Sequence, residues 1–317
     1  MIAYLVRRFL QGIAVLFAVT ILTFGLEKLM PGNPAIDLLG AKANQVQIEQ
    51  IDRLMGLNRP VWVQYWNWLD GLLHGDLGFS YKRGQSVDSL LVVATPKTLV
   101  LVGESTVIAV LIAIPMGILQ AVKRNTFVDY ALTAVSFVLY ATPIFFLGLV
   151  CLLIFSDDLN WFAPSAPSAD GIGPYLTDWN AMFLPVMTLA LPSVAGYSRY
   201  VRSSVLDQIT QEYVRTAVAK GAKQRRVLYR HVLRNALMPM ITLLGYALPA
   251  LFSGALITEV VFNMPGLGLL YVDSAEQQDY ATMLGLTVLI TIATILGSLL
   301  ADLGYAAADP RVRLTGS

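Results

Sequence analysis

The folds open to this chain are limited first by a series of apolar runs long enough to cross a membrane. A helix needs about 20 predominantly apolar residues to span the hydrocarbon core of a bilayer. Six runs of this length occur, at about 9–29, 98–121, 131–155, 182–200, 237–262 and 283–304. Backbone inside a bilayer must satisfy its own hydrogen bonds, so each run is predicted to be a helix. The sequence therefore predicts an all-α integral membrane protein with six transmembrane helices.

The composition and the N-terminus agree with this class. Only 14% of the residues are charged, against about a quarter in soluble domains. Arg7 and Arg8 precede the first apolar run, an arrangement that imitates a signal peptide. The run is too long for one, however, and no small-x-small cleavage site follows it. We expect an uncleaved first span.

The distribution of Lys and Arg predicts the orientation. Fifteen of the 22 basic residues lie in four segments, namely 1–8, 122–130, 199–236 and 305–317. The segments 156–181 and 263–282 contain none. Short cytoplasmic loops hold the excess of Lys and Arg. Both termini and the 199–236 loop are therefore predicted to face the cytoplasm, and residues 30–97 form an outer loop.

The outer segments hold all five tryptophans, namely Trp62, Trp66, Trp68, Trp161 and Trp179. Tryptophan is enriched at the boundary between membrane and water. Residues 60–74 begin with a proline and place aromatic and apolar residues at helical spacing, which predicts an amphipathic interfacial helix followed by a turn at 75–78. This helix is either a plain membrane anchor or a docking surface for an external partner.

Motifs for chemistry are absent from the sequence. There is no phosphate-binding loop of the form G-x-x-x-x-G-K-[S/T], so we expect no ATP hydrolysis on this chain. The two histidines, His74 and His231, fall on opposite sides of the predicted membrane. A histidine-based metal site or catalytic pair is therefore not expected. The sequence predicts no catalytic residues, no metal site and no enzyme activity.

Two acids in the apolar runs are candidates for the translocation pathway. Glu104 lies about two turns into the second run, and Glu259 lies near the outer end of the fifth. Carboxylates inside a bilayer are costly and usually face the helix bundle or a water-filled cavity. The alternative is a structural pairing. Glu27 and Lys28 end the first run, where reaching toward the interface accounts for them.

A basic insert follows the fourth run. Residues 212–239 carry seven Lys and Arg residues against one acid, Glu212. Small and apolar residues at helical spacing predict a helix, a break at Gly221 and a second helix that enters the fifth span. The charges can orient the protein and contact anionic lipid. Aromatic residues are limited to Tyr213 and Tyr229, so binding to nucleic acid is not expected.

This insert resembles a known motif. The permease subunits of binding-protein-dependent ABC importers carry a cytoplasmic E-A-A-x-x-x-G loop. The matching positions here are Arg215, Thr216, Ala217 and Gly221, so the leading Glu and the first Ala are replaced. The later Ile-x-Leu-Pro element retains only Leu233.

The rest of the chain resembles the B-type subunit of the dipeptide/oligopeptide/nickel branch. The resemblance is carried by YLVRRFLQ at 4–11, PGNPA at 31–35, LNRPVWVQYWNWL at 57–69, GDLGFSY at 75–81, EYVRTAVAKG at 212–221, RHVLRNALMP at 230–239, EVVFNMPGLG at 259–268 and DPRVR at 309–313. It covers essentially the whole chain. It implies a single permease domain, 1–317, with the type I ABC importer fold and a coupling loop at 203–235.

The resemblance also implies partners. A sister permease of the C-type completes the pore, two ABC ATPase subunits bind ATP and Mg on the cytoplasmic side, and a binding protein delivers di- or oligopeptides outside. This chain itself is expected to need no cofactor, and the lipid bilayer surrounds it. The implied coupling helix comprises Glu212, Tyr213, Val214, Arg215, Thr216, Ala217, Val218, Ala219, Lys220 and Gly221. Small Ala217 is expected to let this helix seat closely on an ATPase subunit.

Other functions stay open at the level of sequence. Nickel or another small solute is an alternative cargo, because selectivity in such systems is expected to lie largely in the binding protein. A secondary transporter or channel would need ion-coupling residues in mid-span, and the sequence offers no charged relay there.

Overall fold

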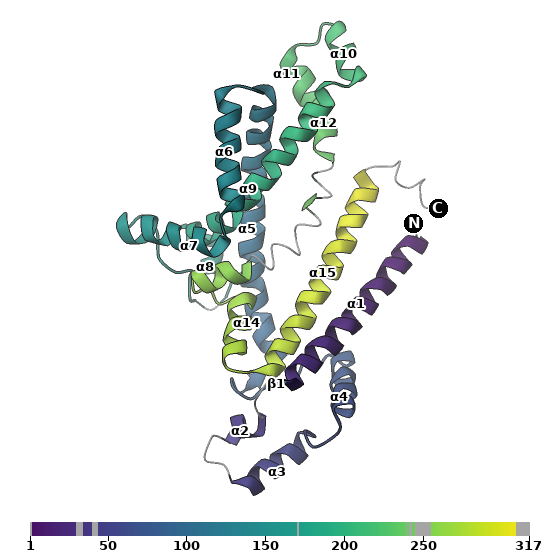
Figure 1. Cartoon of the computed structure of the whole chain (residues 1–317), viewed down its shortest axis with the longest axis vertical. Coiled ribbons are helices and arrows are strands. Elements are labelled where there is room, and N and C mark those ends of the chain that lie inside the picture. The colour runs from purple at the N-terminus through teal and green to yellow at the C-terminus, as the bar shows by residue number, and fades with distance from the viewer. Residues whose placement is uncertain are drawn as a thin grey trace. The chain divides into compact units, whose positions relative to one another are not determined.

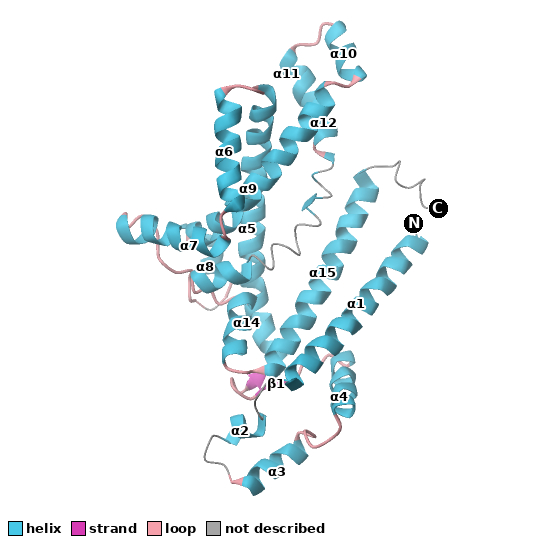
Figure 2. Ribbon diagram, in the orientation of Figure 1, coloured by secondary structure: helices cyan, strands magenta, loops and turns pink. Residues whose placement is uncertain are grey.

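The computed structural model describes residues 2–29, 34–39, 44–169, 171–238, 240, 243–244 and 255–308. These residues are helical apart from loops and one short pair of strands (Figures 1 and 2). The chain divides into two compact units. The first unit consists mainly of residues 98–264 with those from 296 onward, and the second of residues 2–97 and 265–295.

Four described helices are long and apolar enough to cross a membrane. They are α1 (Ile2–Leu29), α5 (Val87–Val122), α9 (Trp179–Ile209) and α15 (Tyr280–Ala308). They correspond to the first, second, fourth and sixth predicted runs. Of the fifth run, 237–262, residues 239, 241–242 and 245–254 lie outside the described residues.

The observed helices extend beyond the predicted apolar runs. The helix α5 begins at Val87 where the apolar run begins at 98, and α9 continues to Ile209 where the run ends at 200. Hydropathy reports the part of a helix that suits hydrocarbon, whereas hydrogen bonding can continue the helix into water. The predicted outer loop 30–97 therefore contains the first turns of α5.

The third predicted span is bent. The helix α6 (Phe127–Ala141) and the pair formed by α7 (Ile144–Cys151) and the π-helical η1 (Leu152–Asp158) meet at an angle of 106°. Pro143 separates the two helices and lacks the N–H that a continuous helix needs. The residue before a proline is pushed to extended backbone, and Thr142 has φ −75° and ψ 126°. Residues 131–155 thus form two helices where one was predicted.

The first unit is built on close packing between α5 and α9. A Cβ added at Gly117 would lie 2.6 Å from the carbonyl oxygen of Ser198 and 2.7 Å from Cβ of Val201. Glycine therefore allows the two helices to approach more closely than any larger residue would. Ala109, Ala113 and Val201 continue this interface as buried residues.

The second unit fastens short elements to the ends of long helices. The helix α4 (Val61–Leu73) packs on α1, with Tyr65 buried beside Phe24. The predicted interfacial helix is thus confirmed as a helix. Strands β1 (Phe79–Ser80) and β2 (Gln85–Ser86) form an antiparallel pair.

Short helices occur in both units. Those of the second unit are α2 (Pro34–Leu39), α3 (Gln45–Leu54) and α14 (Leu267–Glu276). Those of the first unit are α8 (Gly173–Thr177), α10 (Glu212–Ala219), α11 (Gln224–Arg226), η2 (Val227–Val232) and α12 (Leu233–Ala236).

Candidate functional site

The helix α10 is a short helix with a defined end. Gly221 has φ +78°, the left-handed conformation that glycine adopts readily. Its N–H donates to the carbonyl of Val218 at 2.9 Å, and the N–H of Ala222 donates to the carbonyl of Ala217 at 3.1 Å. These two bonds form a Schellman cap, which satisfies carbonyls at the helix end. The predicted break at Gly221 is confirmed.

The two faces of α10 differ in burial. Val214 is buried, while Tyr213 and Ala217 are half-buried against the same core. The exposed face consists of Glu212, Arg215, Thr216, Val218, Ala219 and Lys220. Ala217 packs in part against its own chain, and its close contact with an ATPase subunit stays a prediction. Val218, with 57% of its surface exposed, is the large apolar side chain on this face of α10.

The loop is attached to α9 by an apolar core and by hydrogen bonds. Buried residues of α9, η2 and α12 form one cluster with α10, including Val205, Val232 and Ala236. The hydroxyl of Tyr213 donates to Oε1 of Gln208 at 2.7 Å. The hydroxyl of Ser204 donates to the carbonyl of Ala236 at 2.8 Å. The helix α10 is therefore attached to α9 by packed side chains and by hydrogen bonds.

An ion pair then joins α9 to α6. The guanidinium of Arg202 donates from Nε to Oδ1 and from Nη2 to Oδ2 of Asp129, each at 2.8 Å. Asp129 is buried and also accepts the N–H of Asn125. Bidentate pairs of this kind are the strong ones. This pair was not predicted from the sequence, although Asp129 lies within 122–130 and Arg202 within 199–236, both predicted to be cytoplasmic.

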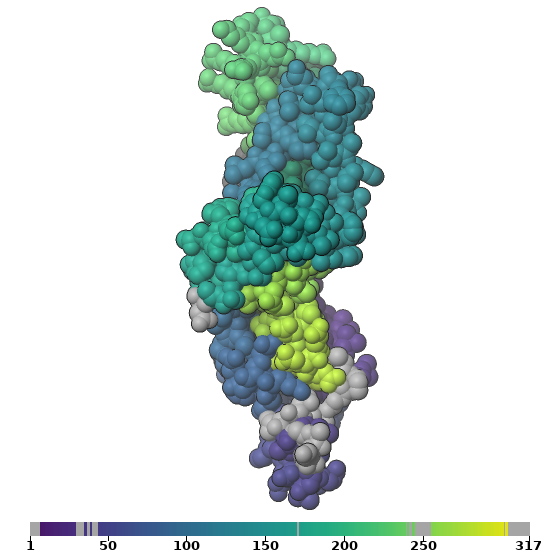
Figure 3. All heavy atoms as spheres, turned by 90° about the vertical axis from the view of Figure 1, so that its left-hand side faces the viewer, coloured from purple at the N-terminus to yellow at the C-terminus, as the bar shows by residue number. Residues whose placement is uncertain are grey.

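The segment after Gly221 presents basic side chains. Exposed residues there include Lys223, Arg225, Arg226, Tyr229, Arg230 and Arg234. In the space-filling view of Figure 3 this loop is the light green knob at the top. Its surface is convex and positively charged.

The two acids chosen as pathway candidates have different environments. Glu259 is fully buried and accepts a hydrogen bond from the hydroxyl of Thr98 at 2.5 Å. This geometry corresponds to the alternative reading, a structural pairing. Glu104 is half-buried on α5, and its Oε2 has no hydrogen-bond partner in the described part of the chain. Of the two, Glu104 has the side chain that can still accept a partner.

Comparison with known families decides what this architecture belongs to. Residues 113–314 match the family described as the binding-protein-dependent transport system inner membrane component. The chain belongs to this family. Residues 1–102 match the N-terminal model of the same membrane component. The two matches together cover both units and the α10 loop.

Similar proteins are transport permeases along their whole length. The oligopeptide transport system permease protein AppB of Bacillus subtilis is 40% identical over 98% of this chain and 99% of its own length. The dipeptide transport system permease protein DppB of Alkalihalophilus pseudofirmus is 33% identical over 99% of this chain and 100% of its own. The glutathione transport system permease protein GsiC of Escherichia coli is 34% identical over 99% of each chain.

Membership settles the general role of the chain. It is the membrane subunit of an ABC importer and a multi-pass protein of the bacterial inner membrane. Its family works with a binding protein, and an ABC importer implies ATPase subunits. Exposed apolar side chains along α1, such as Phe9, Leu22 and Leu26, fit a helix surface that contacts lipid.

Proposed function

We propose that this chain is the B-type permease subunit of an importer that moves di- or oligopeptides into the cytoplasm. It has six transmembrane spans, the type I ABC importer fold and both termini in the cytoplasm. The proposal is supported by family membership and by relatives named for oligopeptides and dipeptides. The distribution of Lys and Arg supports the orientation.

In this proposal α10 is the coupling helix and seats in a cleft of one ATPase subunit. The observation that carries the proposal is the division of α10 into an attached face and an exposed one. Val214 and Tyr213 fix the helix to α9, so that movement of α10 moves α9 with it. Arg215, Val218 and Lys220 remain exposed, and the two cations complement acids on the ATPase.

The partners have separate tasks. A C-type sister permease completes the pore, a binding protein delivers the peptide outside, and two ATPase subunits hold ATP and Mg. Closure of the ATPase pair pushes on α10, and the apolar core beneath α10 transmits this push to α9. Arg202 and Asp129 pass the movement on to α6. The bundle then tilts and the cavity opens outward.

Glu104 is proposed to line the translocation pathway. Its unpartnered Oε2 supports this role, because a buried carboxylate oxygen without a donor can accept one from a passing solute. Glu259 is assigned to the internal contact with Thr98 instead.

Two other functions remain as alternatives. The first is import of nickel or another small solute by the same class of importer, because selectivity is expected to lie largely in the binding protein. The second is a secondary transporter or channel, which works without an ATPase. Purification of the intact complex in mild detergent distinguishes an importer from a secondary transporter or channel, because only an importer retains ATPase subunits.

The experiment that tests coupling is ATP-driven peptide uptake by the complete importer in proteoliposomes. Val218→Asp places a charge on the exposed face of α10 without affecting the core beneath it, since this side chain is 57% exposed. We expect uptake and substrate-stimulated ATP hydrolysis to fall at least tenfold.

The matched control is Tyr229→Asp. Tyr229 is 63% exposed on the same loop but lies beyond Gly221, outside α10. We expect this variant to retain most of the activity. Equal uptake by Val218→Asp and the wild type, with normal membrane insertion of both, would refute the coupling role of α10.

A further inference from the structure

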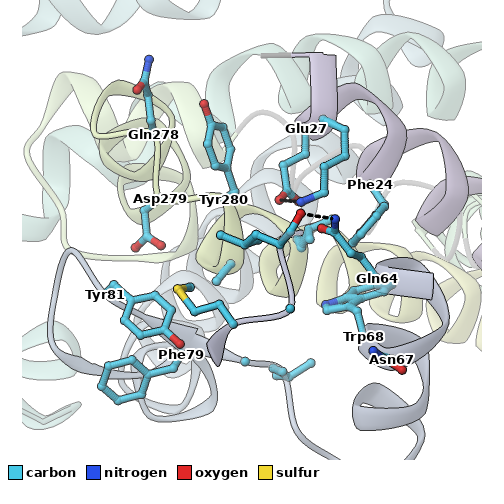
Figure 4. A pocket seen from close by; sticks show the side chains of 18 of the residues that line it. Phe24, Glu27, Gln64, Asn67, Trp68, Phe79, Tyr81, Gln278, Asp279 and Tyr280 are labelled. Atoms are coloured by element: carbon cyan, nitrogen blue, oxygen red, sulfur yellow. Dashed lines mark hydrogen bonds and ion pairs between the residues drawn. The ribbon is translucent and has the colours of Figure 1, made fainter. Parts of the chain in front are cut away.

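A cavity of about 370 Å³ lies within the second unit (Figure 4). It is lined by the end of α1, the turn after α3, one side of α4, the strand segment around β1 and the start of α15. Small-molecule sites in proteins are cavities of this size, with mostly apolar walls and a few converging polar groups. The cavity therefore has the dimensions of a ligand site.

One carboxylate that lines the cavity has an unsatisfied oxygen. Glu27 is 13% exposed, and its Oε2 is buried with no hydrogen-bond partner among the described residues. Its Oε1 lies 3.6 Å from Nζ of Lys28. An unsatisfied buried oxygen costs free energy that a donor on a ligand would recover. Glu27 thus lines the cavity with one oxygen unsatisfied.

Two other polar side chains of the lining are occupied by hydrogen bonds. Asp279, the second lining carboxylate among the described residues, accepts the hydroxyls of Ser80 and Thr282 at 2.5 and 2.7 Å. The Nε2 of Gln64 donates to the carbonyls of Leu57 and Arg59 at 2.9 and 2.7 Å. These bonds build the wall of the cavity. Of the two lining carboxylates among the described residues, Glu27 is the one that keeps an oxygen without a hydrogen-bond partner.

Aromatic rings line the same cavity. Phe24 and Trp68 lie with their ring centroids 5.9 Å apart, and the ammonium of Lys28 lies 5.0 Å from the centroid of Phe24. Phe79 and Tyr81 line the opposite side (Figure 4). Aromatic faces attract cations and also accept apolar side chains. Both signs of charge and apolar walls are therefore present together.

We propose that this cavity binds a short peptide with free termini. Its α-ammonium donates to Oε2 of Glu27, its carboxylate pairs with Lys28, and its side chains contact the rings. A simple cation would be repelled by Lys28, and a simple anion would be repelled by Glu27. A zwitterion can pair with both side chains. This inference rests on the proposed function, because it takes a peptide as the cargo.

The test is photocrosslinking in the complete importer in proteoliposomes, with a radiolabelled tripeptide. Photoreactive benzoylphenylalanine is introduced at Asn67, which lines the cavity, or at Trp62 on the same helix, which is 67% exposed and does not line it. We expect labelling at position 67 that exceeds labelling at 62. An excess of unlabelled tripeptide abolishes the labelling, and the N-acetylated tripeptide does not.

Charge-neutral variants identify the acceptor and the donor. Glu27→Gln, which keeps the shape of the side chain, is expected to lower labelling at position 67 at least tenfold. The control Glu49→Gln, on the exposed surface of α3, leaves it unchanged. Lys28→Gln lowers labelling by the free tripeptide but not by its C-terminal amide.

Equal labelling at positions 67 and 62, or labelling that Glu27→Gln does not reduce, would overturn the inference. The proposed function is judged separately by ATP-driven uptake in the wild type. If the wild type imports the peptide while labelling fails, only the cavity assignment is wrong. If the wild type imports no peptide, the proposed function fails, and this inference fails with it.

Discussion

Two regions of this chain are built in the same way but present different kinds of surface. In the α10 loop, Tyr213 donates its hydroxyl to Gln208 of α9 at 2.7 Å. Beside the cavity, the hydroxyl of Tyr65 on α4 lies 3.0 Å from that of Thr20 on α1. In each region a short helix is attached to a long one by a tyrosine and a few apolar side chains.

The surfaces that result are different. The α10 loop exposes a convex surface rich in Lys and Arg, whereas α4 helps to line a cavity whose walls include the half-buried carboxylate of Glu27. A convex charged surface suits another protein, and an enclosed acid with aromatic walls suits a small ligand. Variants that weaken one attachment should therefore spare the function of the other region.

The largest effect is expected from Gly221→Pro. Proline fixes φ near −65° and has no N–H, whereas Gly221 has φ +78° and donates to Val218. We expect a local cost of at least about 3 kcal/mol and a loss of ATP-driven uptake. Peptide photolabelling at the cavity is retained.

The matched variant is Gly221→Ala. No described atom lies within 4 Å of the added Cβ, so only the backbone conformation is strained. We expect a cost of about 1 kcal/mol and partial uptake. Full uptake by Gly221→Pro at wild-type expression would show that the end of α10 does not matter.

The next effect is expected from Arg202→Leu. It leaves the buried carboxylate of Asp129 without its bidentate partner, at a cost of about 3 kcal/mol, the lower end for a buried pair, because the Arg202 side chain is 29% exposed. The midpoint of thermal unfolding of the importer in detergent measures this loss. The double variant Arg202→Leu with Asp129→Leu should regain much of it, and failure to regain it would argue against the pair.

The smallest effect is expected from Tyr65→Phe. It removes the hydrogen bond between the hydroxyls of Tyr65 and Thr20, at a cost of about 1 kcal/mol. Photolabelling at the cavity should weaken a few-fold, because α4 holds its wall, while ATP hydrolysis stimulated by the binding protein is unchanged. The reverse outcome, coupling impaired with labelling intact, would contradict the separation of the two regions.

Features set by hydropathy and local geometry could be predicted from the sequence. The runs that form α1, α5, α9 and α15 are apolar enough to identify without tertiary contacts. The end of α10 depends on Gly221, whose conformation only glycine adopts readily. The helix expected at 60–74 could be predicted from the helical spacing of its aromatic and apolar residues.

Features that depend on tertiary contacts could not be predicted. Asp129 and Arg202 are 73 residues apart in sequence, and their pairing depends on how α6 packs on α9. The direction in which Ala217 and Glu27 face is set by neighbouring helices. The bend at Pro143 was not predicted either. Pro185 and Pro192 lie inside α9, which continues through both without a break. A proline in the sequence therefore does not by itself locate a bend.

The most direct test of the coupling proposal is cysteine crosslinking in the complete importer. With Cys151, the single native cysteine, replaced by serine, Val218→Cys and Val214→Cys place one thiol on each face of α10. We predict that the thiol at 218 crosslinks to an ATPase subunit and is protected from maleimide in the complex, whereas the thiol at 214 does not crosslink. A thiol at 218 that reacts freely with maleimide in the assembled importer and forms no crosslink would contradict the proposal.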